Sequence, residues 1–105
     1  MEEKEQKQLN TFLYQLEQKV KSPPIAFDYM EWKEDVEEIA KKIKEISLTS
    51  YEGIEGLLEN ILADAENYNT CLIEEGRISE MEYLRTKYFA EVGFIISEIN
   101  RAKLI

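Results

Sequence analysis

A chain of 105 residues, 44% of them hydrophobic, can form one folded domain with one apolar core, so we expect a single helical domain over residues 1–105. The net charge of −9 argues against binding to nucleic acid or to an anionic membrane surface, because both attract clustered Lys and Arg. The chain has no His and a single Cys, which excludes the commonest general base, the commonest transition-metal ligand and an internal disulfide. No segment is apolar enough to span a bilayer and the first residues do not form a signal peptide, so we expect a cytoplasmic location. The excess of Glu over Asp favours a microbial or viral source.

Apolar residues recur every three or four positions between a few breaks, and this spacing predicts amphipathic helices. Pro24 ends the first helix, because a proline moves the preceding residue out of the helical region. Gly76 ends the third as a left-handed cap. The expected helices cover residues 3–21, 29–47, 50–75 and 80–103.

Three expected helix starts have the spacing of a capping box, in which a side-chain oxygen accepts a hydrogen bond from a free backbone N–H. The pairs are Asp28 with Glu31, Thr49 with Glu52, and Ser79 with Glu82. Hydrophobic staples are expected beside two of them, from Phe27 to Trp32 and from Ile78 to Tyr83.

The apolar stripes predict the core and the fold class. We expect an all-α, antiparallel up-down-up-down four-helix bundle, because short connections make successive helices antiparallel neighbours. The last two helices should be longer than the first two, so the second hairpin should overhang by ~9 Å at 1.5 Å per residue. An overhang leaves apolar surface uncovered, and this favours a homodimer. The expected core residues are Leu9, Phe12, Leu13, Leu16, Val20, Tyr29, Trp32, Val36, Ile39, Ala40, Ile43, Ile46, Ile54, Leu57, Leu58, Ile61, Leu62, Ala65, Tyr68, Leu72, Ile73, Met81, Leu84, Tyr88, Val92, Ile95, Ile99 and Ala102, with Phe89 and Ile96 beside them.

Acidic residues concentrate in the third expected helix. From residue 45 to residue 76 the chain has eight acidic residues and neither Lys nor Arg. One interpretation is that neighbouring helices supply compensating cations, with Arg85 placed to reach Glu66. The other is a docking surface for a basic protein. The candidate surface, called the acidic ridge below, consists of Glu52, Glu55, Glu59 and Glu66.

The last expected helix also has apolar residues outside its main stripe. Tyr83, Ala90 and Phe94 form this second set, called the outer strip below. Gly93 beside Phe94 would allow another backbone to approach closely, at a cost of roughly 1 kcal/mol in helix propensity. A line of apolar residues on an already long helix predicts a contact surface, and we assign it to the homodimer.

We therefore expect a non-catalytic protein-interaction module with no catalytic, cofactor-binding or metal-binding residues. It would be a small inhibitor, immunity or adaptor protein that binds another, basic protein through its acidic helix face. The alternative is a structural subunit of a larger helical assembly, which would be insoluble without its partner.

A third hypothesis is an enzyme similar to the all-helical, Mg²⁺-dependent nucleotide pyrophosphohydrolases. These hold the metal with Glu-x-x-Glu on one helix and Glu-x-x-Asp on the next. The first spacing occurs at Glu31–Glu34, Glu34–Glu37 and Glu52–Glu55, but no Glu stands three residues before an Asp. The glutamates of helix 29–47 also fall opposite its apolar stripe, whereas a metal site needs them to face inward.

Overall fold

The computed structural model describes the backbone of residues 2–24, 28–73 and 78–103, and the side chains of these residues apart from 71–80. This part of the chain contains four helices and no strand. They are α1 (Glu3–Lys21), α2 (Tyr29–Ile46), α3 (Leu48–Ile73) and α4 (Ile78–Lys103). The expected all-α class is confirmed.

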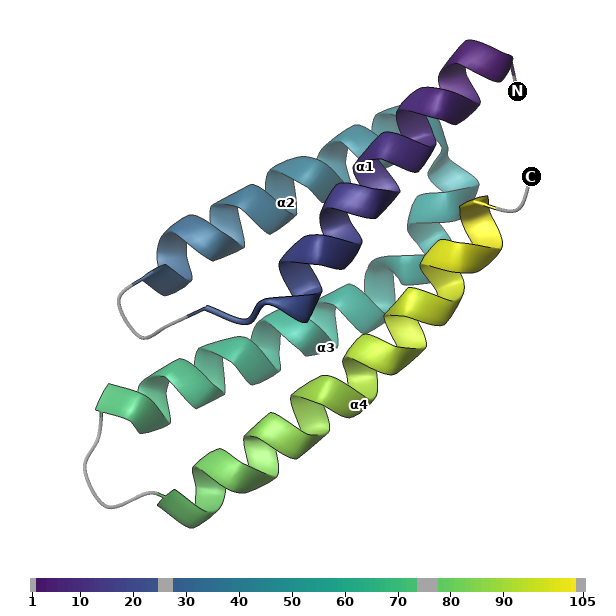
Figure 1. Cartoon of the computed structure of the whole chain (residues 1–105). Coiled ribbons are helices and arrows are strands. Elements are labelled where there is room, and N and C mark those ends of the chain that lie inside the picture. Colours follow the sequence, from purple (N-terminus) through teal and green to yellow (C-terminus); the bar gives the residue numbers. More distant parts are fainter. Residues whose placement is uncertain (1, 25–27, 74–77, 104–105) are drawn as a thin grey trace.

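The helices form an antiparallel bundle in which each helix packs against two neighbours. α1 contacts α2 and α4, and α3 contacts the same two helices from the other side. Successive helices run in opposite directions, so both termini lie at one end of the bundle (Figure 1). α3 and α4 have 26 residues each, against 19 in α1 and 18 in α2, as predicted. The last turns of α3 and the first turns of α4 continue past the end of α1 (Figure 1).

The core is built from the predicted stripes of all four helices. Its buried apolar members are Leu9, Leu13, Leu16, Val20, Tyr29, Trp32, Val36, Ala40, Ile43, Ile54, Leu58, Ile61, Ala65, Tyr88, Val92, Ile95 and Ile99. Other predicted members, such as Phe12, Ile39 and Leu57, are half-buried at the edges. Phe89 departs from the prediction, because 41% of it is exposed. Leu72 and Ile73 lie outside the described side chains.

The start of α3 differs from the prediction. The helix begins at Leu48 rather than at residue 50, and its cap is Ser47 rather than Thr49. Ser47 Oγ accepts a hydrogen bond from the backbone N–H of Ser50 at 3.3 Å. The backbone N–H of Ser47 also donates to Ile43 O at 2.8 Å, so one residue ends α2 and begins α3. A junction this short leaves no room for the predicted box at Thr49.

The predicted cap at Asp28 is also wrong, because its side chain makes no capping hydrogen bond. Its backbone has φ −101° and ψ 4°, which differs from the extended conformation of a capping residue. The predicted box at Ser79 and both staples involve side chains outside the described set, although α4 itself begins at Ile78.

The end of α1 is fixed by two aromatic side chains. In a continuing helix the carbonyls of Lys19 and Val20 would accept hydrogen bonds from residues 23 and 24, but both are prolines and have no N–H. Trp32 Nε1 donates to Lys19 O at 3.0 Å, and Tyr88 Oη donates to Val20 O at 2.7 Å. The donors come from α2 and α4, so these bonds fasten the end of α1 to both of its neighbours.

Candidate functional site

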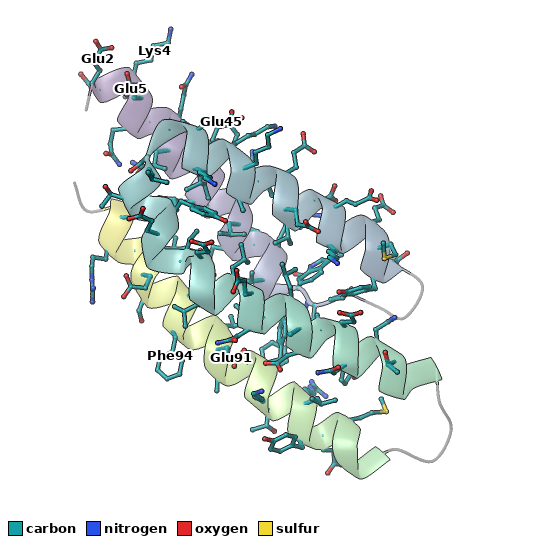
Figure 2. The ribbon with its side chains drawn as sticks, turned by 180° about the vertical axis from the view of Figure 1, so that it is seen from behind. Glu2, Lys4, Glu5, Glu45, Glu91 and Phe94 are labelled. Atoms are coloured by element: carbon teal, nitrogen blue, oxygen red, sulfur yellow. The ribbon has the colours of Figure 1, made fainter. Side chains whose placement is uncertain are left out.

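The outer strip of α4 faces away from the core. Tyr83 is 67% exposed and Phe94 is 62% exposed, and Ala90 between them is exposed as well. Figure 2 shows the Phe94 ring projecting away from the bundle. Lys87 belongs to the same stretch of helix, but its ammonium nitrogen lies 3.3 Å from Asp64 Oδ1 on α3. The charge is therefore directed toward α3, and the strip itself stays apolar.

Two helical glycines of the α3–α4 hairpin have no packing reason within the chain. Apart from its chain neighbours and the adjoining backbone of its own helix, a Cβ atom added at Gly56 or at Gly93 would meet no described atom within 4 Å, and both residues are exposed. Glycine in a helix interior costs about 1 kcal/mol relative to alanine. Gly93 adjoins the outer strip, so open space for another backbone exists beside Phe94.

The acidic ridge is exposed along its whole length, since all four side chains reach solvent: Glu52, Glu55, Glu59 and Glu66. Glu55 and Glu59 line a groove between α2 and α3 with a volume of about 330 Å³. Lys41 and Lys44 of α2 line the same groove. The structure therefore places cations opposite the middle of the ridge, and leaves Glu52 and Glu66 outside the groove.

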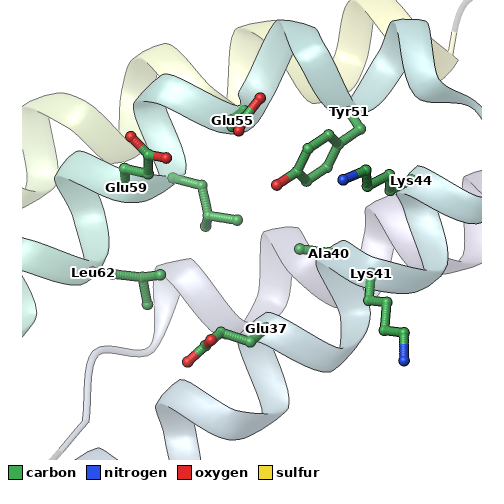
Figure 3. A pocket seen from close by; sticks show the side chains of 9 residues that line it. Glu37, Ala40, Lys41, Lys44, Tyr51, Glu55, Glu59 and Leu62 are labelled. Carbon is green, nitrogen blue, oxygen red and sulfur yellow. The ribbon is translucent and has the colours of Figure 1, made fainter.

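The groove has an apolar floor and an acidic rim. Ala40, Leu58 and Leu62 form the floor. Figure 3 shows Lys44 beside Tyr51 at one end of the groove, and Lys44 Nζ lies 5.2 Å from the centre of that ring. None of the described acids Glu37, Glu55 and Glu59 forms an ion pair with Lys41 or Lys44. The acidic rim therefore keeps its charge available to a ligand.

The negative potential of the ridge is visible in two tyrosines. Burial raises the pKa of Tyr51, and the charges of Glu55 and Glu59 raise it further. The pKa of Tyr29 is raised by burial and then by Glu66 and Glu37. A raised pKa means that the negatively charged form of each tyrosine is disfavoured, which is expected beside unpaired carboxylates.

The predicted ion pair between Arg85 and Glu66 does not form. The Arg85 guanidinium lies over the Phe89 ring instead, 5.9 Å from its centre. Among the described side chains, Lys87 and Asp64 form an ion pair across the hairpin. Arg85 points toward the side of α4 that carries Phe89, because the two positions are four residues apart on the helix.

A buried acidic pair was missed by sequence reasoning. Asp64 on α3 is only 2% exposed, and it interacts with the half-buried carboxyl group of Glu91 on α4. The available signal was spacing: Asp64 stands three residues after Ile61, and Glu91 stands three after Tyr88 and four before Ile95. Acidic residues at stripe positions on two neighbouring helices could have indicated a contact between them.

The spacings considered for a magnesium enzyme do not converge on one site. Glu31, Glu34 and Glu37 are exposed on the outside of α2, while Glu52 and Glu55 belong to α3. Within the described residues, no group of three or more His, Cys, Asp or Glu side chains could hold a metal ion.

None of the described helices is both long enough and apolar enough to cross a membrane. Comparison of the chain with protein-family models, with curated proteins and with solved structures gives no match.

Proposed function

We propose that this chain is a non-catalytic protein-interaction module that forms a homodimer through the outer strip of α4. The observation that carries the proposal is the exposure of Tyr83 and Phe94 on a helix whose opposite face already fills the core. Covering a large side chain of this kind contributes about 1.5–3 kcal/mol. In a two-fold dimer both chains use the same strip, so each residue contributes twice.

Charge placement supports a second copy of the chain as the occupant. The described part of α3 has exposed acids and no Lys or Arg, whereas α4 carries the exposed Arg101 beyond the outer strip. A two-fold arrangement that brings α4 of one chain toward α3 of the other would pair Arg101 with the acidic ridge. Such complementarity acts mainly on specificity and on the rate of encounter.

The test is the oligomeric state of the variant Phe94→Glu, measured by light scattering or sedimentation. The substitution places a charge in the strip without touching the core, so the variant should stay helical and become monomeric. The matched control is Met30→Glu, because Met30 is a large apolar residue on α2 that is 61% exposed, close to the 62% of Phe94. That variant should remain dimeric. A wild-type chain that is monomeric at high micromolar concentration contradicts the proposal.

The acidic ridge supports a second interface, for a basic protein partner. The observation that favours it is that Glu55 and Glu59 stay unpaired above an apolar floor, although lysines line the same groove. A partner segment with an apolar side chain between two cations would match both features. A ridge that served only internal charge balance would instead be ion-paired.

The ridge can be tested by changing Glu55, Glu59 and Glu66 together to Gln. If the ridge is a binding surface, removing like charges at i, i+4 spacing relieves a few tenths of a kcal/mol per pair. The thermal midpoint at low salt should then stay the same or rise. A triple change of Glu31, Glu34 and Glu45 on α2 controls for net charge. A midpoint that falls for the ridge variant alone would show that the ridge has internal cationic partners.

A further inference from the structure

The contact between α3 and α4 contains a group of three charged side chains that the proposed interfaces do not use. Asp64 is buried, with 3% of its side chain exposed, and Lys87 is about half exposed at the rim. Glu91 completes the group where α3 and α4 meet (Figure 2). The groove between α2 and α3 includes neither Asp64 nor Glu91. The burial of Asp64 places the group in the contact between α3 and α4.

The two carboxyl groups have complementary unsatisfied atoms. Asp64 Oδ1 faces the Lys87 ammonium group at 3.3 Å, but Asp64 Oδ2 is buried and accepts no hydrogen bond. Glu91 Oε2 is also buried and also has no hydrogen-bond partner. Two deprotonated carboxylates can only accept hydrogen bonds, whereas a protonated carboxyl group also donates one. One proton on Glu91 would satisfy both atoms through a single O–H···O bond to Asp64.

We propose that Asp64 and Glu91 share one proton between Asp64 Oδ2 and Glu91 Oε2, and that this proton is a pH-dependent link between α3 and α4. Lys87 compensates the one remaining negative charge of the pair. When the proton leaves, two like charges stay in a partly buried contact with one lysine beside Asp64, and the contact between α3 and α4 is weakened at this level. The link is independent of the proposed dimer and of the acidic ridge.

Two charged side chains of the described residues act on Glu91, so its pH dependence can be assigned to them. From α3 the group that acts on Glu91 is Asp64, and from α4 itself it is Lys87. In the described part of the chain, α1 and α2 present no charged group that acts on Glu91. The pKa of Lys87 is raised, first by its hydrogen bond with Asp64 and then by the charge of Asp64, so the lysine stays charged while Glu91 titrates.

The sign of the pH dependence follows from these contacts. Burial raises the pKa of Glu91 first, and the hydrogen bond and charge of Asp64 raise it further, from 4.5 to about 7. The folded chain thus holds this proton more tightly than the unfolded chain. The stability that the proton contributes is complete below pH 4.5 and is lost as pH rises to about 7.

The first experiment measures the folding equilibrium constant by denaturant titration at pH 5 and pH 8, at one protein concentration. For the wild type the constant should fall on the order of a hundredfold, because each unit between the folded and unfolded pKa of one group is a factor of ten. In Glu91→Gln the amide N–H should donate to Asp64 at both pH values, so most of this fall should disappear. At pH 8 the variant should be more stable than the wild type. Glu82→Gln, an exposed change on the same helix, should keep the wild-type fall.

The second experiment follows the side-chain carboxyl carbon of Glu91 by NMR in the wild type, so it does not depend on how the variants fold. We expect a midpoint near 7, and a return toward the ordinary value of glutamate in Asp64→Asn, where the like charge is gone. A Glu91 that titrates like an exposed glutamate overturns the proposal. So does a Glu91→Gln variant with an unchanged pH dependence.

Discussion

The α3–α4 hairpin has two halves that differ in packing although both continue the same helices. In the packed half, which spans residues 48–65 and 88–103, the stripes are buried against α1 and α2, as Ile61 and Ile95 illustrate. In the outer half, which spans residues 66–73 and 78–87, the described side chains are half-buried or exposed. Tyr68 and Leu84 occupy stripe positions there and are only half-buried.

The difference shows that periodicity assigns a residue to a face, whereas burial requires a helix opposite that face. α1 ends at Lys21 because Pro23 and Pro24 follow, so it cannot cover the outer half. The polar groups that enter the hairpin's interior, Asp64 and Glu91, lie next to this transition. Asp64 itself is buried, but its neighbours Glu91 and Lys87 keep partial access to water, which makes the charged group less costly than in the middle of the core.

The largest expected effect contrasts a core leucine with a leucine of the outer half. Leu13→Ala removes a fully buried side chain and should lower the free energy of unfolding by about 2–5 kcal/mol. Leu84→Ala removes a half-buried one and should cost about 1 kcal/mol or less. Chemical denaturation of both variants measures the contrast. Equal losses would mean that the outer half is covered as completely as the core.

The next effect concerns the hydrogen bond that marks the boundary between the halves. Tyr88→Phe removes the donor to Val20 O and leaves that carbonyl buried at the end of α1, which should cost about 1–3 kcal/mol. Tyr83→Phe, at an exposed tyrosine of the same helix, should leave stability unchanged. The wild-type pKa of Tyr88 should also lie above that of free tyrosine, because burial raises it. A Tyr88→Phe variant as stable as the wild type would show that the carbonyl finds another donor.

The smallest effect tests where the packed half begins. Ser47→Ala removes the oxygen that accepts the Ser50 N–H, and should lower stability by about 1 kcal/mol. Thr49→Ala should have almost no effect, since Thr49 is exposed and is already the second residue of the helix. Thermal unfolding of the two variants decides between the two caps. A larger loss at Thr49 would restore the capping box that the sequence suggests.

Much of the fold could be derived from the sequence because the signals are local. The spacing of apolar residues places Leu13, Val36 and Val92 on inner faces, and the structure buries all three. The end of α1 follows from the missing N–H groups of Pro23 and Pro24. The placement of Tyr83 and Phe94 on an outward face follows from the same spacing, since a residue opposite the stripe stays in solvent.

Tertiary structure alone decided which distant residues meet. Ser47, Thr49 and Ser50 all have side chains that can cap a helix. Ser47 caps α3 because the turn after α2 is so short that α3 begins at the next residue. Helix pairing brings Asp64 to Glu91 across 27 positions of sequence. Arg85 and Lys87 stand two positions apart on α4. Only Lys87 lies on the side of the helix that faces Asp64, whereas Arg85 lies over Phe89. These outcomes depend on the rotation of one helix against another, which the packing of the whole core fixes and no local pattern encodes.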